Sequence, residues 1–284
     1  MIIEILKAIL FGIVEGITEW LPVSSTGHII LLEAIWPPNI SADFYNFFEI
    51  IVQLAAIMAV VILFFRKLNP LARTKTVEEK KNTWHLWFKV VVAVLPSAVI
   101  GYLVDGPLDD FLAATPVAAT TLKVVVVAAA LIAYGAAFIL LEKKQNRQFR
   151  IEAVEQIDYK TALFIGMFQC LSIIPGTSRS GATILGAIML GVSRPAGAEF
   201  SFFLAIPTML GASLLKLLDF LEVGITATNT EIVFLIVSCV VAFAVSLLAI
   251  KALMEYVRKH SFAVFGIYRI ILGVAVLGYF LLAR

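Results

Sequence analysis

The chain has 284 residues, of which 61% are hydrophobic and only 15% charged, and its formal net charge is +2. A soluble domain has about 25% charged residues, and about half of its residues are apolar. The apolar excess excludes an ordinary soluble domain, because one core could not bury it, and predicts an all-α polytopic membrane protein. The small net charge gives no reason to expect a nucleic-acid partner.

The chain opens with a broken apolar region at 2–36, which the sequence LPVSSTGH interrupts at 21–28. Three uninterrupted apolar stretches follow. The same order then recurs, with a second broken region at 161–192, interrupted by PGTSRSG, and three more stretches. A helix needs about 20 apolar residues to cross the hydrocarbon. The six uninterrupted stretches are therefore predicted membrane spans, at 44–65, 86–104, 117–141, 196–218, 232–250 and 262–282.

The two broken regions are predicted to enter the membrane and return to the same side as re-entrant hairpins. The proline and glycine residues in each break would leave backbone groups unpaired in lipid. Such breaks are tolerated at membrane depth only where protein buries them or where they face a polar cavity. Each half of a broken region is also too short to cross alone.

Charge in the connecting segments predicts the orientation. Lysine and arginine are concentrated in three segments, 66–85, 142–160 and 251–261. The other three contain acids but neither lysine nor arginine, at 37–43, 105–116 and 219–230. Basic loops stay in the cytoplasm. The basic and acidic segments alternate consistently between the two sides only if each hairpin returns to the side from which it entered, which predicts that both termini lie outside.

The two halves of the chain resemble one another weakly. GIVE at 12–15 corresponds to GMFQ at 166–169, and each break contains a proline, a Ser/Thr cluster and a glycine. We predict one membrane domain over 1–284 made of two repeats, 1–141 and 160–284, each a hairpin followed by three spans. Three crossings are an odd number, so the second repeat is expected to lie inverted. Inverted repeats with broken helices place their site near the middle of the membrane.

Two acids of the first broken region, Glu15 and Glu19, are four residues apart and share one face of a helix. Carboxylates within a membrane segment are costly and usually functional. A pair on one face suits a divalent cation that also holds phosphate oxygens. We therefore predict that Glu15 and Glu19 bind Mg²⁺ or Ca²⁺. The alternative is that this segment lies near the interface and its acids reach water.

The hydroxyl residues of each break are predicted to lie where a helix begins. A helix N-terminus offers free N–H groups and a positive dipole end, and both bind anions. Two such ends facing one cavity would form a diphosphate cradle, and ordinary N-capping is the alternative for each hydroxyl. Two residues near the start of the next span, Glu49 and Gln53, are added as cavity-lining candidates. The predicted cradle residues are Ser24, Thr26, Thr177, Ser178 and Ser180.

Arg179 and His28 are further candidates for catalytic side chains. An arginine in the second break has no route to snorkel out of the membrane, and its planar fork suits phosphate oxygens. An ion pair with Glu15 or Glu49 is the structural alternative for Arg179. His28 lies in the first break and changes charge near neutral pH. Arg269, within the last predicted span, is expected instead to snorkel towards the membrane surface.

The sequence EGITEWLPVSSTGH at 15–28 resembles the acidic first motif of the undecaprenyl-diphosphate phosphatases associated with bacitracin resistance. PGTSRSGAT at 175–183 resembles their second motif, and EFSF at 199–202 is also similar to the family. The likeness covers nearly the whole chain. It implies that the protein removes the terminal phosphate of undecaprenyl diphosphate, which returns the monophosphate carrier to cell-wall synthesis. It also implies a divalent-metal requirement, a polyprenyl diphosphate partner, and a place in the bacterial inner membrane with the active site open to the outer side.

The resemblance assigns Glu15 and Glu19 to the family's acidic pair and Arg179 to the arginine of its second motif. The expected catalytic residues are therefore Glu19, Ser25, His28 and Arg179. Phosphoryl transfer needs mainly positioning and charge neutralisation. The sequence leaves open whether Ser25 or His28 is the nucleophile.

A transporter is the main alternative function, because inverted repeats with broken helices are a transporter architecture. A phosphatidic-acid-type lipid phosphatase is disfavoured, because residues 25–28 match its Ser-Gly-His motif only in part and its distant histidine motif is absent. The sequence leaves a homodimer open.

Overall fold

The computed structural model is helical throughout the residues that it describes, which are 1–113, 116–143, 149–223 and 227–282; side chains at 105–113, 116–121, 216 and 219–223 are not described. Within this part of the chain, six helices are long and apolar enough to cross a membrane. The all-α fold and the six spans are thereby confirmed. The spanning helices are α3 (Ala42–Leu63), α5 (Val77–Ala113), α6 (Pro116–Lys143), α9 (Arg194–Val223), α10 (Asn229–Lys259) and α11 (Ala263–Leu282).

Several helices extend beyond the predicted spans. The basic segment 251–261 was predicted as a loop, but α10 continues through it to Lys259, and α5 begins at Val77 within the predicted loop 66–85. A short helix, α4 (Phe65–Leu68), also lies in that segment. Lysine, arginine and glutamate are good helix formers, so a helix need not end where it leaves the lipid. The outer-loop acids at 105–110 and 219–222 lie outside the described side chains.

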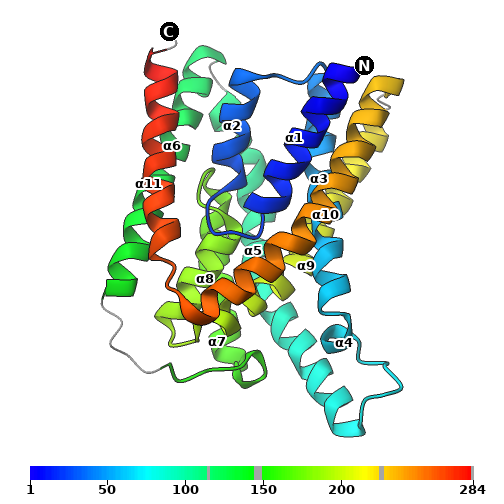
Figure 1. Cartoon of the computed structure of the whole chain (residues 1–284), viewed down its shortest axis with the longest axis vertical. Helices are drawn as coiled ribbons and strands as arrows, with labels where there is room; N and C mark the ends of the chain where they lie inside the picture. Colours follow the sequence, from blue (N-terminus) through cyan, green and yellow to red (C-terminus); the bar gives the residue numbers. More distant parts are fainter. Residues whose placement is uncertain (114–115, 144–148, 224–226, 283–284) are drawn as a thin grey trace.

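Each broken region forms a helical hairpin. Hairpin 1 consists of α1 (Ile2–Thr18), a tip at 19–24 and α2 (Ser25–Ile35). Hairpin 2 consists of α7 (Tyr159–Gln169), the short helix η2 (Cys170–Ile173), a tip at 174–178 and α8 (Arg179–Met189). Figure 1 shows the hairpins entering from opposite ends of the molecule and their tips meeting in its middle.

Both termini lie at the same end of the molecule (Figure 1), as the predicted topology requires. Each hairpin is followed by three long helices, in the order expected of the two repeats. The placement of the hairpins as re-entrant elements of a membrane, and the inverted relation of the repeats, stay predictions.

The first helix of each hairpin packs against a spanning helix of the other half. A Cβ atom placed on Gly12 of α1 would lie 2.6 Å from the Ser238 carbonyl oxygen of α10. A Cβ atom on Gly166 of α7 would collide with the Ala93 backbone of α5. Small residues let helix backbones approach closely within a membrane protein. The hairpin of each half is therefore packed against a spanning helix of the other half.

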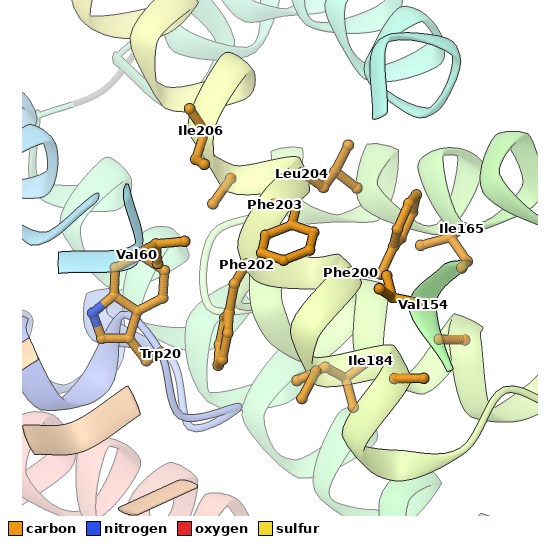
Figure 2. Packing of buried hydrophobic residues seen from close by; sticks show 14 of the residues in the cluster. Trp20, Val60, Val154, Ile165, Ile184, Phe200, Phe202, Phe203, Leu204 and Ile206 are labelled. Carbon is orange, nitrogen blue, oxygen red and sulfur yellow. The ribbon is translucent and has the colours of Figure 1, made fainter. Parts of the chain in front are cut away.

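The tip of hairpin 1 is anchored in the main hydrophobic cluster. Trp20 is fully buried, and its ring meets that of Phe202 edge-to-face at 5.4 Å between centroids. Figure 2 shows Trp20 between Val60 of α3 and the phenylalanines of α9. Lipid is as apolar as these side chains, so close packing rather than escape from water holds the cluster together. The packing fixes Glu19, the residue before Trp20, next to α9.

Candidate active site

A serine at each hairpin tip caps the helix that follows. Ser24 has φ 74° and Ser178 has φ 67°, and these are the non-glycine residues with positive φ in the described chain. The Ser24 Oγ accepts a hydrogen bond from the Gly27 N–H at 3.4 Å, and the Ser178 Oγ accepts one from the Gly181 N–H at 3.2 Å. The predicted helix starts are thus confirmed, and the hydroxyls of both serines perform N-capping. Their contact with substrate stays a prediction.

A small polar cavity lies between hairpin 1 and α3. Its volume is about 40 Å³, enough for an ion or a few waters but not for a diphosphate. The structure therefore gathers five predicted site residues around one small cavity. The polar residues that line it are Glu15, Ser25, Thr26, Glu49 and Gln53.

The cavity carries an unpaired carboxylate oxygen. Glu15 is 4% exposed, and its Oε1 is buried without a hydrogen-bond partner. Glu49 lines the same cavity. Mg²⁺ and Ca²⁺ prefer oxygen ligands, so these residues fit a divalent cation. No cluster of three His, Cys, Asp or Glu side chains occurs in the described part of the chain, and the remaining ligands would be water or substrate oxygens.

Glu19 and Arg179 form a buried ion pair that joins the two hairpins. The Arg179 Nη2 donates to the Glu19 Oε1 at 3.0 Å, and the two side chains are 10% and 8% exposed. The Arg179 Nη1 donates to the Ser201 carbonyl of α9 at 2.9 Å, while its Nε is buried without a partner. The ion-pair partner of Arg179 is thus Glu19, rather than Glu15 or Glu49.

Ser180 also links the tips. Its hydroxyl donates to the Glu19 carbonyl oxygen at 3.1 Å. One helical turn later, the hydroxyls of Thr183 and Ser201 lie 2.6 Å apart, which ties α8 to α9 beside the Arg179 contact. The predicted substrate-binding residue Ser180 therefore has a structural role in this conformation.

His28 is held by Ser24 and Tyr268 instead of facing the acids. Its Nδ1 lies 2.7 Å from the Ser24 carbonyl oxygen, which can only accept, so this nitrogen carries the proton. In the neutral ring, Nε2 is then an acceptor, and the Tyr268 hydroxyl donates to it at 2.6 Å. The two rings are stacked, with 12° between their planes.

Arg269 is fully buried, so the prediction that it snorkels to the surface is wrong. It donates to the carbonyl oxygens of Pro22 at 3.2 Å, Gly176 at 3.0 Å and Thr177 at 2.9 Å. Two of these carbonyls belong to the tip of hairpin 2 and one to that of hairpin 1. The Thr177 side chain, a predicted cradle residue, is also fully buried.

A sequence signal for this burial does exist. Arg269 shares the buried face of α11 with Gly266 and Gly273, and small residues at this spacing indicate a helix–helix contact. A Cβ atom on Gly266 would lie 2.6 Å from the Gly135 carbonyl oxygen of α6. The arginine thus lies on a packed face, where a route through lipid to the surface is closed.

Comparison with known proteins agrees with these motifs. The family model described as bacitracin resistance protein BacA matches residues 8–275. The chain is 52% identical to the undecaprenyl-diphosphatase 1 of Clostridioides difficile over 281 residues, covering 99% of this chain and 98% of that protein. It is 52% identical to an undecaprenyl-diphosphatase of Enterococcus faecalis, covering 97% of each chain, and 49% identical to that of Lactiplantibacillus plantarum, covering 99% of each. With its motifs in place and its full length matched, the chain belongs to the BacA family of bacitracin resistance proteins.

Proposed function

We propose that the protein is a membrane phosphatase that hydrolyses undecaprenyl diphosphate to undecaprenyl phosphate and phosphate. Relatives that are about half identical over nearly the full length are named for this activity. The observation that carries the proposal is the ion pair between Glu19 and Arg179, which lies where two helix N-termini approach each other. Such a place binds and neutralises a diphosphate, which is most of what phosphoryl transfer requires.

Arg179 is proposed to bind oxygens of the diphosphate. Its Nε is buried and unpaired, so a donor remains for an anion even while Nη2 contacts Glu19. A phosphate oxygen would also replace part of the Glu19 contact. The free N–H groups at the start of α2, beside Ser25 and Thr26, supply further donors.

Ser25 is the better supported nucleophile. It lines the cavity that contains the unpaired Glu15 oxygen, whereas both ring nitrogens of His28 are bonded to other groups. In the proposed reaction, the Ser25 Oγ bonds to the terminal phosphorus, the bond from that phosphorus to the bridging oxygen breaks, and the hydroxyl proton passes to the departing oxygen. Undecaprenyl phosphate leaves, and water then hydrolyses the phosphoserine to release phosphate.

A divalent cation is proposed to be held by Glu15 and by Glu19, whose second carboxylate oxygen is not used by Arg179. When bound, the cation neutralises charge on the phosphate oxygens. Glu49 is the neighbouring acid in the cavity. The polyprenyl chain of the substrate lies in the bilayer, and the oligomeric state, including a homodimer, stays a prediction.

Phosphate release from purified protein in detergent tests the function. Prenyl diphosphate should yield free phosphate and prenyl monophosphate, and a chelator should abolish the reaction until Mg²⁺ or Ca²⁺ is restored. A transporter needs two separated compartments, so turnover in detergent distinguishes an enzyme from a transporter. Absence of phosphate release with each of these metals would reject the phosphatase.

Orientation is proposed from the distribution of basic residues, with hairpin 1 opening to the outer side. In a background lacking Cys170 and Cys239, a cysteine at Asn39 should react with an impermeant thiol reagent added to intact cells. A cysteine at Lys81 should react only after the cells are opened. Both positions are exposed in the structure. The reverse labelling pattern would invert the proposed orientation.

A further inference from the structure

The Arg269 guanidinium donates hydrogen bonds to both hairpin tips. Its Nη1 donates to the Pro22 carbonyl of hairpin 1, and its Nη2 donates to the Gly176 and Thr177 carbonyls of hairpin 2. Pro22 and Gly176 each lie two residues before the capping serine of their tip. The guanidinium therefore grips the two tips at equivalent points, immediately before the helix starts.

The environment of Arg269 holds its guanidinium in place. The group lies 5.4 Å from the centre of the Tyr134 ring of α6. A Cβ atom on Gly181 of α8 would lie 3.0 Å from its Nη1, so the group also rests against the start of α8. The backbone of α11 is fixed by its close contact with α6. A planar group held in this way sets a rigid spacing between the atoms that it binds.

Stability alone does not account for this residue. Among the described side chains, no carboxylate forms an ion pair with Arg269, and its Nε is buried without a hydrogen-bond partner. A buried cation without a counterion is costly, and apolar packing usually stabilises a protein as well or better. The two helix starts that Arg269 ties together are those proposed to hold the diphosphate.

We infer that Arg269 is a positioning residue for phosphoryl transfer, which fixes the distance between the N-termini of α2 and α8. This inference rests on the proposed function. Without the link, Ser25 at the start of α2 and Arg179 at the start of α8 drift relative to each other. Misplacement of reacting groups by about 1 Å costs on the order of a hundredfold in rate.

The test is Arg269→Lys, which keeps the charge but has one nitrogen in place of two. That nitrogen reaches one tip and leaves the other untied. We expect kcat to fall by about tenfold to a hundredfold, with KM changed less than threefold. Arg194→Lys is the matched control, because Arg194 pairs with Glu142 away from the tips. The control should keep the kcat of the unmodified protein.

A spectroscopic measurement tests the link without relying on activity. Spin labels at Ile17, in the last turn of α1, and at Ile174, in the tip of hairpin 2, report the distance between the two hairpins, and both side chains are exposed. Arg269→Lys should broaden or shift this distance distribution, and Arg194→Lys should not. If the unmodified protein lacks phosphatase activity, the proposed function fails, while the spin-label result still decides whether Arg269 links the tips.

A milder variant covers the case in which Arg269→Lys does not fold. Tyr134→Leu removes the ring over the guanidinium and should lower kcat several-fold, whereas Tyr134→Phe keeps the ring and should lower it less. The inference is overturned if the folded Arg269→Lys protein keeps its kcat and tip distance. If that protein does not fold, an unchanged kcat in Tyr134→Leu overturns it.

Discussion

The two hairpins share a backbone plan but differ in their side chains. Both end in a serine at positive φ whose hydroxyl caps the following helix. One turn before the tip, hairpin 1 has Glu15, whose Oε1 is unpaired beside a cavity, and hairpin 2 has Gln169. The Gln169 Nε2 donates to the Ser97 hydroxyl at 2.6 Å and to the Thr208 hydroxyl at 3.1 Å. The Gln169 Oε1, like the Glu15 Oε1, is buried without a partner. The two halves therefore differ in that hairpin 1 has a carboxylate beside a cavity, whereas hairpin 2 has a neutral amide whose nitrogen is bonded to α5 and α9.

The helices after the hairpins repeat this difference. Glu49 of α3 lines the cavity beside Glu15, whereas Glu199, near the start of α9, pairs with Lys67 at 2.7 Å. Lys67 also pairs with Glu155 at 2.7 Å. In the proposed mechanism hairpin 2 supplies Arg179 to the site, and the acid of the helix that follows it, Glu199, is paired with a lysine. A few side chains, rather than the backbone, therefore distinguish the half that is proposed to bind the metal from the other half.

The largest effect is expected from Arg179, the contribution of hairpin 2. Arg179→Lys keeps the charge but loses the planar fork, so turnover should fall by about a hundredfold or more if two phosphate oxygens are bound. Phosphate release at saturating substrate measures the effect. Near-normal turnover in the lysine variant would remove Arg179 from the catalytic residues and leave it a structural partner of Glu19.

Arg179→Ala separates the structural part of that effect. It leaves the Glu19 carboxylate buried without its partner, which should cost about 3–5 kcal/mol of stability. Melting temperatures of the alanine and lysine variants, measured side by side in detergent, give the comparison. We expect the lysine variant to melt close to the unmodified protein.

Glu15→Gln makes hairpin 1 resemble hairpin 2 at the position where they differ most. Loss of the unpaired carboxylate should weaken the apparent affinity for Mg²⁺ by at least about tenfold, with activity partly restored at high metal. Titration of phosphate release with Mg²⁺ measures this. An unchanged titration curve would mean that Glu15 is not a ligand.

Gln169→Glu is the reverse exchange and should affect stability instead of metal affinity. The Ser97 and Thr208 hydroxyls donate to backbone carbonyls of their own helices, so a carboxylate would find no donors in them. We expect a loss of about 1–3 kcal/mol, seen as a lower melting temperature, with Gln169→Met as the uncharged control. A gain of metal affinity in this variant would contradict the proposal that only hairpin 1 binds the metal.

The smallest effects concern the caps that the hairpins share. Ser24→Ala and Ser178→Ala should each lose about 0.5–2 kcal/mol from the cap, plus strain at positive φ. Ser24→Gly and Ser178→Gly should lose less, because glycine adopts positive φ freely. Thermal unfolding of the four variants tests this. If only the Ser24 variants lose activity at unchanged stability, Ser24 also contacts substrate.

The sequence by itself determined the all-α fold, the six spans, the two breaks and most of the residues around the site. The reason is that lipid forces apolar runs to be helical and makes each polar residue within them costly. Glu15, Ser25 and Glu49 were found in this way, and the structure brings them to one cavity. The helix starts at Ser25 and Arg179 followed from local turn and capping preferences.

Only the tertiary structure decided which polar groups meet. The sequence offered Glu15 or Glu49 as partners of Arg179, but the packing of Trp20 against α9 places Glu19 there instead. The sequence also predicted that Arg269 reaches the membrane surface, whereas the structure buries it between the tips. The contact of His28 with Tyr268 of α11 had no signal in the sequence. These contacts join residues more than 90 positions apart, and a sequence pattern reports the face on which a residue lies, not the side chain that it will face across the fold.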